Sequence, residues 1–232
     1  MIKLKTQERY SLHYLKWHEA SENHYLMHMK FIKEIKKYLP NEKDTKILDV
    51  GCGIGCVLFC LKELGYRKLK GIEVDRELVE IGKKTGIDIE FVEDSVVWLK
   101  ERKEEFDVVL LLDVLEHLAK DNQIELLKAI HNSLKREGKL ILTVPNANSP
   151  FACRWRYIDF THTTSYTEHS IQYVLQNSGF KKIIIEDIIP FNKLWFFKKF
   201  TRAIYRIFLI SEFGLEGFKI PLSLNLLVVA WK

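Results

Sequence analysis

Residues 46–55 of the chain read Lys-Ile-Leu-Asp-Val-Gly-Cys-Gly-Ile-Gly, and this stretch decides the fold. The apolar run at 46–50 predicts a buried strand, and the three glycines that follow predict a tight loop. Residues 56–64 then have a helical pattern that Gly65 ends. A strand, a glycine loop and a helix in this order are typical of an open α/β sheet, which binds its ligand at the carboxyl ends of the strands, where this loop lies.

Strands and helices alternate along most of the remaining chain, after a predicted helix at 22–38. The pattern predicts strands at 68–74, 88–92, 106–112, 138–144, 180–188 and 224–231, helices at 76–84, 95–103, 121–135 and from Thr167 to about Gly179, and a polar, aromatic loop at 146–166. This order favours an α/β, Rossmann-like fold with a seven-stranded, mostly parallel sheet and helices on both faces.

The glycine loop differs from the fingerprint of dinucleotide-binding enzymes. That fingerprint, Gly-x-Gly-x-x-Gly, requires glycine or alanine at position 56, where this chain has Cys56, and Gly55 comes one position early. Asp49 places a negative charge beside the loop, which disfavours a pyrophosphate and favours a ligand with a cationic end. An NAD-dependent oxidoreductase is therefore only an alternative interpretation.

With Asp49-x-Gly51-x-Gly53-x-Gly55 after its first strand, the chain resembles the class I S-adenosylmethionine-dependent methyltransferases of types 11, 12 and 23. The motifs Gly71-Ile-Glu73-Val-Asp75, Asp94-Ser95, Phe106 to His117 and Gly138 to Asn146 follow in the order of that family. The resemblance implies S-adenosyl-L-methionine as co-substrate and an antiparallel last strand. It also implies a set of donor-binding residues: Asp49, Gly51, Gly53, Gly55, Glu73, Asp94, Ser95 and Asp113.

The resemblance gives these residues separate roles. Glu73 stands where the family places a carboxylate on the ribose hydroxyls, which it could bind through a charge-assisted pair of hydrogen bonds. Asp94 and Ser95 match the position that holds the adenine amine. The partner of Asp49 is either the donor or a backbone amide, and the sequence leaves both open.

A second group of residues follows the fourth strand. Asp113, Glu116 and His117 are spaced i, i+3 and i+4, so a helix there would carry all three on one face, and His162 lies in the later polar loop. The group is similar to clusters near the methyl group in ubiquinone-pathway O-methyltransferases and small-RNA 2′-O-methyltransferases.

Three interpretations of this group stay open. In the first, His117 or His162, with Glu116 beside them, is a catalytic general base for an acceptor hydroxyl. In the second, Asp113, Glu116, His117 and His162 hold a divalent metal ion that polarises the hydroxyl. In the third, Glu116 and His117 form a structural turn.

The cysteines do not indicate a disulfide scaffold or a metal cluster. Cys52, Cys56 and Cys60 have the equal spacing of one helix face, which favours small core residues over ligands. The first residues lack the apolar core of a secretory signal, and no apolar run is long enough to span a membrane. We therefore expect a cytoplasmic protein.

The net charge of +5 belongs to one segment. Residues 190–211 contain five basic residues and no acidic ones, while the remaining 31 basic residues balance the 31 acidic residues. On a helical wheel, Lys198, Lys199, Arg202 and Arg206 form one stripe of a helix at 194–210, opposite an aromatic and aliphatic side. Such a helix either contacts a membrane surface or packs on the domain, and the balanced charge elsewhere makes nucleic acid an improbable partner.

These observations predict an N-terminal helical cap at 1–40 and a methyltransferase domain at 41–232 with a basic amphipathic insertion at about 190–222. We expect O-methylation of a small or amphiphilic acceptor, such as a glycan, a glycolipid, a lipid-linked glycan or a quinone-like molecule. The acceptor would be chosen by Tyr14, Trp17 and His18, by the 146–166 loop and by the insertion. A non-catalytic nucleotide-binding module is the alternative from another class.

Overall fold

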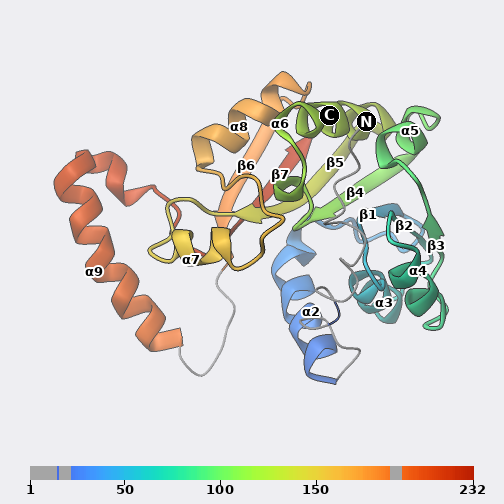
Figure 1. Cartoon of the computed structure of the whole chain (residues 1–232), viewed down its shortest axis with the longest axis horizontal. Coiled ribbons are helices and arrows are strands. Elements are labelled where there is room, and N and C mark those ends of the chain that lie inside the picture. The colour runs from blue at the N-terminus through green and yellow to red at the C-terminus, as the bar shows by residue number, and fades with distance from the viewer. Residues whose placement is uncertain (1–14, 16–21, 189–194) are drawn as a thin grey trace.

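A computed structural model describes residue 15 and residues 22–188 and 195–232. Its centre is one seven-stranded sheet in the order β3-β2-β1-β4-β5-β7-β6 (Figure 1). The strands are β1 (Lys46–Val50), β2 (Lys68–Glu73), β3 (Ile89–Phe91), β4 (Phe106–Leu112), β5 (Leu134–Pro145), β6 (Lys182–Asp187) and β7 (Asn225–Trp231). The first five run parallel, and β7 pairs antiparallel with both β5 and β6. The predicted α/β fold and the antiparallel last strand are both confirmed.

Helices cover both faces of the sheet, as the alternating sequence predicts. They are α2 (Glu22–Ile35), η2 (Lys36–Tyr38), α3 (Cys56–Glu63), α4 (Arg76–Lys83), α5 (Ser95–Lys100), η3 (Leu115–His117), α6 (Lys120–Ser133), α7 (Ala152–Tyr157), α8 (Glu168–Asn177), α9 (Trp195–Phe213) and η4 (Gly214–Phe218).

Two hydrophobic clusters hold these layers together. On β4, Val108 and Leu110 face the cluster with α2, α3 and α4, while Val109 and Leu111 face the cluster with α5, α6 and α8. Successive side chains of a strand point to opposite faces, so a strand that is apolar at every position is covered on both sides. The carboxyl ends of the parallel strands meet at one edge, where the glycine loop lies (Figure 1).

The structure differs from the prediction in the loop after β5. The expected irregular stretch at 146–166 contains the short helix α7, whose N-cap residue, Phe151, makes no side-chain capping bond. A helix start without a polar cap leaves no local signal in the sequence. In addition, β5 begins at Leu134 rather than near 138, because a register shift lets it pair with Phe106 before the regular ladder begins.

Cys52, Cys56 and Cys60 do not share one helix face, so that prediction is wrong. Cys52 is buried in the glycine loop, and Cys60, on α3, is buried in the core. Cys56 is half-buried at the start of α3. The equal spacing therefore continues from a loop into a helix.

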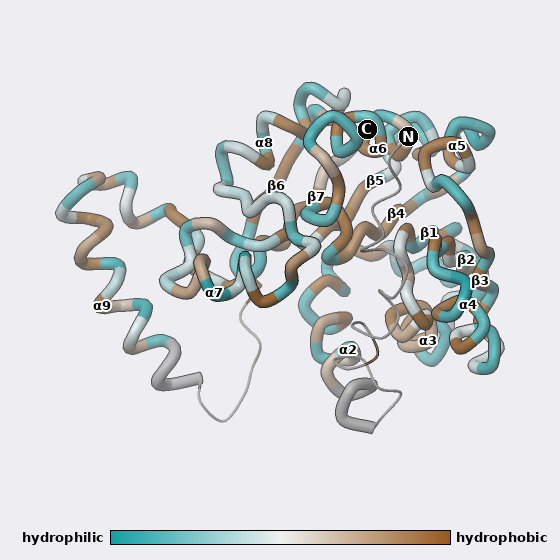
Figure 2. Tube along the Cα trace, in the orientation of Figure 1, coloured by the Kyte–Doolittle hydropathy of each residue, from teal (hydrophilic) through white to brown (hydrophobic). Residues whose placement is uncertain are grey.

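Helix α9 lies at one end of the molecule, beyond α7 (Figure 1). Figure 2 shows apolar and polar residues alternating along it. Phe200, Ile207 and Phe208 are 59%, 67% and 63% exposed. These three side chains are largely uncovered by the described part of the chain, and the choice between membrane contact and packing on the domain stays a prediction.

Helix α9 is attached to the turn that follows it. Arg206 donates hydrogen bonds to the carbonyl oxygens of Gly217 (2.6 Å) and Ile220 (2.5 Å). Gly217 lies so close to α9 that a Cβ there would come within 2.7 Å of the Leu209 backbone. One basic residue of the stripe thus faces the protein.

Among the helices that the structure describes, none has the length and apolarity needed to cross a membrane.

Candidate functional site

A cavity of about 2030 Å³ opens at the carboxyl ends of β1, β2, β4 and β5. Its wall includes α2, the glycine loop, the start of α5, the turn η3, the loop around α7 and one side of α9. A pocket for one small ligand is typically about 300–1,000 Å³. The cavity therefore has room for a donor and an acceptor together.

The glycine loop adopts a conformation that suits glycine. Gly51, Gly53 and Gly55 have φ angles of 72°, 54° and 78°, in the left-handed region where other residues are strained. A Cβ on Gly51 would also lie 2.6 Å from Cγ2 of Val114, beside the cavity. The loop thus requires glycine for both its conformation and its packing.

Glu73 fastens the glycine loop to the end of β2. Its carboxylate accepts hydrogen bonds from the backbone N–H groups of Gly53 (2.9 Å), Val74 (2.7 Å) and Asp75 (3.1 Å). Burial raises the pKa of Glu73, and these three bonds oppose the rise. An ionised carboxylate has about four acceptor positions, so Glu73 keeps capacity for one further donor from the cavity.

Asp49 is the buried carboxyl group of this site. It is 2% exposed, lines the cavity, and has a pKa raised to about 7 by burial and by the nearby charge of Glu73. Within the described ranges, no hydrogen bond to its carboxylate is found, whereas a backbone amide was one of its two expected partners. A ligand group as the partner of Asp49 stays a prediction.

Asp94 and Ser95 stand at the start of α5, on the cavity wall. Oδ1 of Asp94 accepts hydrogen bonds from the N–H groups of Val96 (2.7 Å) and Val97 (3.1 Å) and so caps the helix. The side chain therefore caps the helix, and the adenine-binding role that the resemblance implies stays a prediction.

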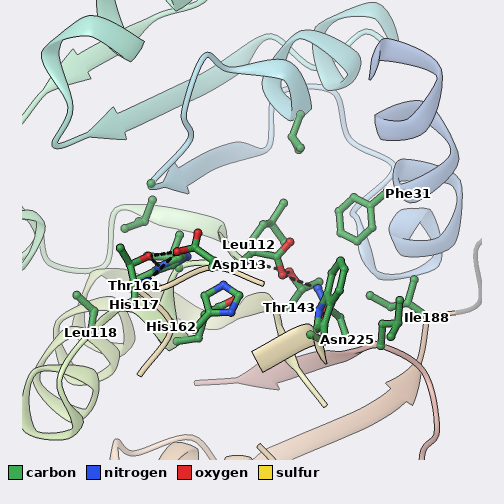
Figure 3. Close-up of a pocket in the computed structure, with 18 of the residues that line it drawn as sticks. Phe31, Leu112, Asp113, His117, Leu118, Thr143, Thr161, His162, Ile188 and Asn225 are labelled. Carbon is green, nitrogen blue, oxygen red and sulfur yellow. Dashed lines mark hydrogen bonds between the residues drawn. The ribbon is translucent and has the colours of Figure 1, made fainter. Parts of the chain in front are cut away.

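Asp113 lines the same cavity as Glu116, His117 and His162, but its hydrogen bonds go to other residues. Its φ angle is 53°, and its Oδ1 accepts hydrogen bonds from Thr143 Oγ1 (2.8 Å) and Asn225 Nδ2 (2.7 Å) (Figure 3). The chain forms only the short turn η3 after β4, so no helix aligns Asp113 with Glu116 and His117. The spacing argument for a four-residue cluster was therefore wrong at Asp113.

Glu116, His117 and His162 do come together. One potential ligand atom from each lies within 4.8 Å of the others, and the two imidazole rings meet edge to face with their centroids 4.8 Å apart (Figure 3). Burial raises the pKa of Glu116 well above its usual range, and burial lowers the pKa of His162. Both shifts favour the uncharged forms of these two groups.

Several buried polar atoms near this cluster lack hydrogen-bond partners among the described residues. They are Glu116 Oε2, His162 Nδ1, Ser165 Oγ and Tyr166 Oη. Unpaired buried polar atoms are costly, and they gather where a water, an ion or a ligand completes the site. Glu116 and His162 both line the cavity, so this cluster is where we expect a reacting group to bind.

The sequence interpretation missed Asp159 and Thr161. Thr161 Oγ1 lies 2.7 Å from His117 Nδ1 and donates a hydrogen bond to Asp159 Oδ1 at 2.6 Å. Asp159 is 9% exposed. The density of polar residues at 159–167 was the available signal, but the contact joins positions 44 residues apart and has no local pattern.

Comparisons with known proteins agree with this arrangement. A family profile described as a methyltransferase domain matches residues 23–184. The ubiquinone biosynthesis O-methyltransferase of Ruegeria pomeroyi is 30% identical over 44% of this chain and 42% of that protein. The phosphoethanolamine N-methyltransferase of Triticum aestivum is 26% identical over 67% of this chain and 32% of that protein.

The matched segments span from about a third to half of these curated relatives. Among solved structures, a SAM-dependent methyltransferase from Archaeoglobus fulgidus superposes with a TM-score of 0.68 at 21% identity, covering 97% of this chain and 100% of that one. At this identity the likeness concerns the fold.

Proposed function

We propose an acceptor class and a reaction for this chain, which belongs to the methyltransferase domain family and is an S-adenosylmethionine-dependent methyltransferase. The proposed reaction is O-methylation of a small or amphiphilic acceptor, such as a glycan, a glycolipid or a quinone-like molecule. The observation that carries it is the cluster of Glu116, His117 and His162 in the same cavity as the glycine loop.

The residues at the glycine loop fit the donor. Gly51 and Asp49 both line the cavity, and Asp49 offers a carboxylate to the donor's cationic amino-acid part. The remaining acceptor capacity of Glu73 suits a ribose hydroxyl. We assign donor binding to these three, to Gly53, Gly55, Asp94 and Ser95, and to Asp113 through its place at the end of β4.

Bound S-adenosylmethionine supplies a methyl group on a positively charged sulfur, which an acceptor oxygen can displace. The chain's part is to hold the two reactants in line and to take the proton from the hydroxyl. His117 and His162 are the groups that can take it, since an imidazole accepts a proton near neutral pH. Glu116, favoured in its uncharged form, would bind the acceptor rather than compete for the proton.

A divalent metal is a second candidate, favoured by the proximity of potential ligand atoms from Glu116, His117 and His162. Such an ion would polarise the acceptor hydroxyl. Asp113 is not in this group of three, and its Oδ1 accepts hydrogen bonds from Thr143 and Asn225.

Acceptor choice is assigned to the parts that lie outside the shared core. In this proposal residues 1–40 form a helical cap on a domain at 41–232, and about 190–222 form an insertion. Phe31 of α2, Trp155 of α7 and Tyr205 of α9 all line the cavity, so three separate segments shape its wall. The expected contributors Tyr14, Trp17 and His18 lie outside the described residues.

The exposed side of α9 favours an amphiphilic acceptor taken from a membrane surface. Phe200, Ile207 and Phe208 present apolar area to solvent, and Lys199 and Arg202 lie on the same helix. A basic amphipathic helix of this kind binds an anionic bilayer in two ways: its apolar side chains are buried in the membrane surface, and its basic side chains are attracted to anionic lipids. We place the protein in the cytoplasm, at the inner face of a membrane, and its free thiols suit a reducing compartment.

Methyl transfer from labelled donor tests the reaction. The protein is incubated with methyl-labelled S-adenosylmethionine and a panel of phenolic, glycolipid and amine acceptors, and mass spectrometry locates the label. We expect an O-methyl product, with turnover about 10²–10⁴-fold lower in His117→Gln or His162→Gln. The matched control is His169→Gln, whose side chain is 86% exposed and away from the cavity.

Each alternative predicts a different result. Label on amines only would replace O-methylation with N-methylation, and full turnover in both histidine variants would exclude a histidine base. Loss of turnover with a chelator would favour the metal. Donor binding without any transfer would indicate a non-catalytic module, and binding of NAD in place of the donor would indicate an oxidoreductase.

Co-sedimentation with vesicles tests the membrane contact separately. We expect binding to anionic vesicles and none to neutral ones, and loss of binding in the double variant Phe200→Asp, Ile207→Asp. Tyr173→Asp is the matched control, because Tyr173 is 65% exposed on α8. Equal binding of both variants would contradict a role for α9.

A further inference from the structure

We propose that Asp159 and Thr161 are positioning residues that fix His117 as its Nδ1–H tautomer, so that Nε2 is the nitrogen that accepts the proton. This inference rests on the proposed function for its purpose. Its structural part, the tautomer, stands on the hydrogen bonds alone.

The side chains of Asp159, Thr161 and His117 form a chain of hydrogen bonds in which the position of each proton is fixed. The Thr161 hydroxyl has one proton, and it donates that proton to Asp159 Oδ1 at 2.6 Å. An ionised carboxylate has no proton to return, so the hydroxyl oxygen can only accept at its other contact. That contact is His117 Nδ1, at 2.7 Å, which must therefore carry a hydrogen.

The tautomer decides which nitrogen can act as a base. A neutral imidazole has one N–H and one lone pair, and the hydrogen bond made by one nitrogen sets the state of the other. With the hydrogen on Nδ1, the lone pair is on Nε2. Thr161 thus links the buried carboxylate of Asp159 to Nδ1 of His117.

The turn that carries these residues is held rigidly enough to keep this geometry. Oδ1 of Asp159 also accepts the backbone N–H of Thr161 at 2.8 Å, so both groups of Thr161 are fixed on one oxygen. The backbone N–H of Thr163 donates to the carbonyl oxygen of Glu116 at 2.7 Å. The Thr163 hydroxyl, with its one proton, lies 2.7 Å from the carbonyl oxygen of Leu118 and 2.8 Å from that of Glu116, so the same loop is bound to η3. Thr161 thereby contacts the His117 ring, and Thr163 holds the backbone of the turn η3 that carries this ring.

The same arrangement serves a metal ligand equally well. A histidine that binds a metal through one nitrogen commonly donates its other N–H to an acceptor, which fixes the ring. The inference therefore concerns His117 in either of the two proposed roles. It adds two residues to the site that the family resemblance did not indicate.

Nuclear magnetic resonance of the unliganded protein tests the tautomer directly. Long-range ¹H–¹⁵N spectra of ¹⁵N-histidine-labelled protein distinguish a protonated from an unprotonated nitrogen at each ring position. The His117 signals are those lost in His117→Gln. We expect Nδ1–H in the wild type at a pH where the ring is neutral, loss of that preference in Thr161→Val, and its return in Thr161→Ser.

Thr164→Val is the matched control, since its hydroxyl lies next to the cluster without contacting His117. Calorimetry with S-adenosylhomocysteine checks that each variant keeps a folded donor site, and we expect affinities within about twofold of the wild type.

Three results would overturn the inference: Nε2–H in the wild type, Nδ1–H retained in Thr161→Val, or the same change in Thr164→Val. None of them depends on turnover, so a failure of the proposed reaction and a failure of this relay are distinguishable.

Discussion

Replacing Asp49 by Asn should make the unliganded protein more stable at high pH and less able to bind its donor. The carboxyl group of Asp49 has a pKa of about 7 in the folded chain and an ordinary value of 3.8. Between these values the folded state holds one more proton than the unfolded state, so the free energy of unfolding falls as the pH rises. The difference in pKa corresponds to about 4 kcal/mol at pH 8, at about 1.36 kcal/mol per unit.

Unfolding in urea at pH 5 and pH 8, for the wild type and Asp49→Asn, measures this pH-dependent contribution of Asp49 to the free energy of unfolding. An unpaired Asn amide has its own burial cost of about 1–3 kcal/mol, but this cost is the same at both pH values. The advantage of the variant should therefore grow by roughly 2.5 kcal/mol from pH 5 to pH 8.

The ionisation of Asp49 should also change the affinity for the donor. If a cationic group of the donor meets Asp49, the affinity for S-adenosylhomocysteine should weaken as the pH falls through about 7 in the wild type. The variant should bind more weakly and lose that pH dependence. An advantage that does not change between pH 5 and pH 8 would refute the reasoning.

Three further predictions concern the loop and helix α9. Glu73→Ala removes the acceptor for the N–H groups of Gly53, Val74 and Asp75, so the free energy of unfolding should fall, since each stranded amide costs about 1–3 kcal/mol. It also removes the proposed hydrogen bond to the ribose, worth about 1.5–3 kcal/mol, so affinity for S-adenosylhomocysteine by calorimetry should fall about 10–100-fold. Near-wild-type affinity would contradict the role of Glu73. Gly51→Ala should lower the free energy of unfolding by about 1–3 kcal/mol, because Gly51 has a left-handed φ and a Cβ there would clash with Val114. Adding Val114→Ala should remove the clash but not the cost of the left-handed backbone. An unchanged urea midpoint in Gly51→Ala would count against this strain. Arg206→Met should speed proteolysis within 214–220, because the carbonyl oxygens of Gly217 and Ile220 lose their hydrogen-bond donor. Calorimetry should show an unchanged affinity for S-adenosylhomocysteine. Unaltered cleavage would show that Arg206 does not hold this turn.

The sequence predicted the sheet well because every strand carries its own local signal. On β4, alternate residues enter opposite clusters, and the continuous apolar run records that burial on both faces. The donor end was predictable for the same reason, since glycines in a strand-to-helix loop have few structural alternatives. The boundaries of β5 were not, because a register shift depends on the neighbouring strand.

The reacting end of the cavity was predictable only in part. Glu116 and His117 could be singled out by their position after β4, but the left-handed backbone at Asp113 and the short turn η3, which replace the expected helix, have no signal in the spacing. The link from Thr161 to His117 joins two loops that are remote in sequence. Likewise, a helical wheel shows that α9 is amphipathic but does not show what covers its apolar side.

A crystal structure with S-adenosylhomocysteine bound tests the central claim most directly. The account predicts that the amino-acid end lies against Asp49 and Gly51, and that the sulfur faces the space in front of His117 and His162, with no side chain in between. A sulfur directed toward α2, with the histidine cluster on the far side of the adenine, would contradict it.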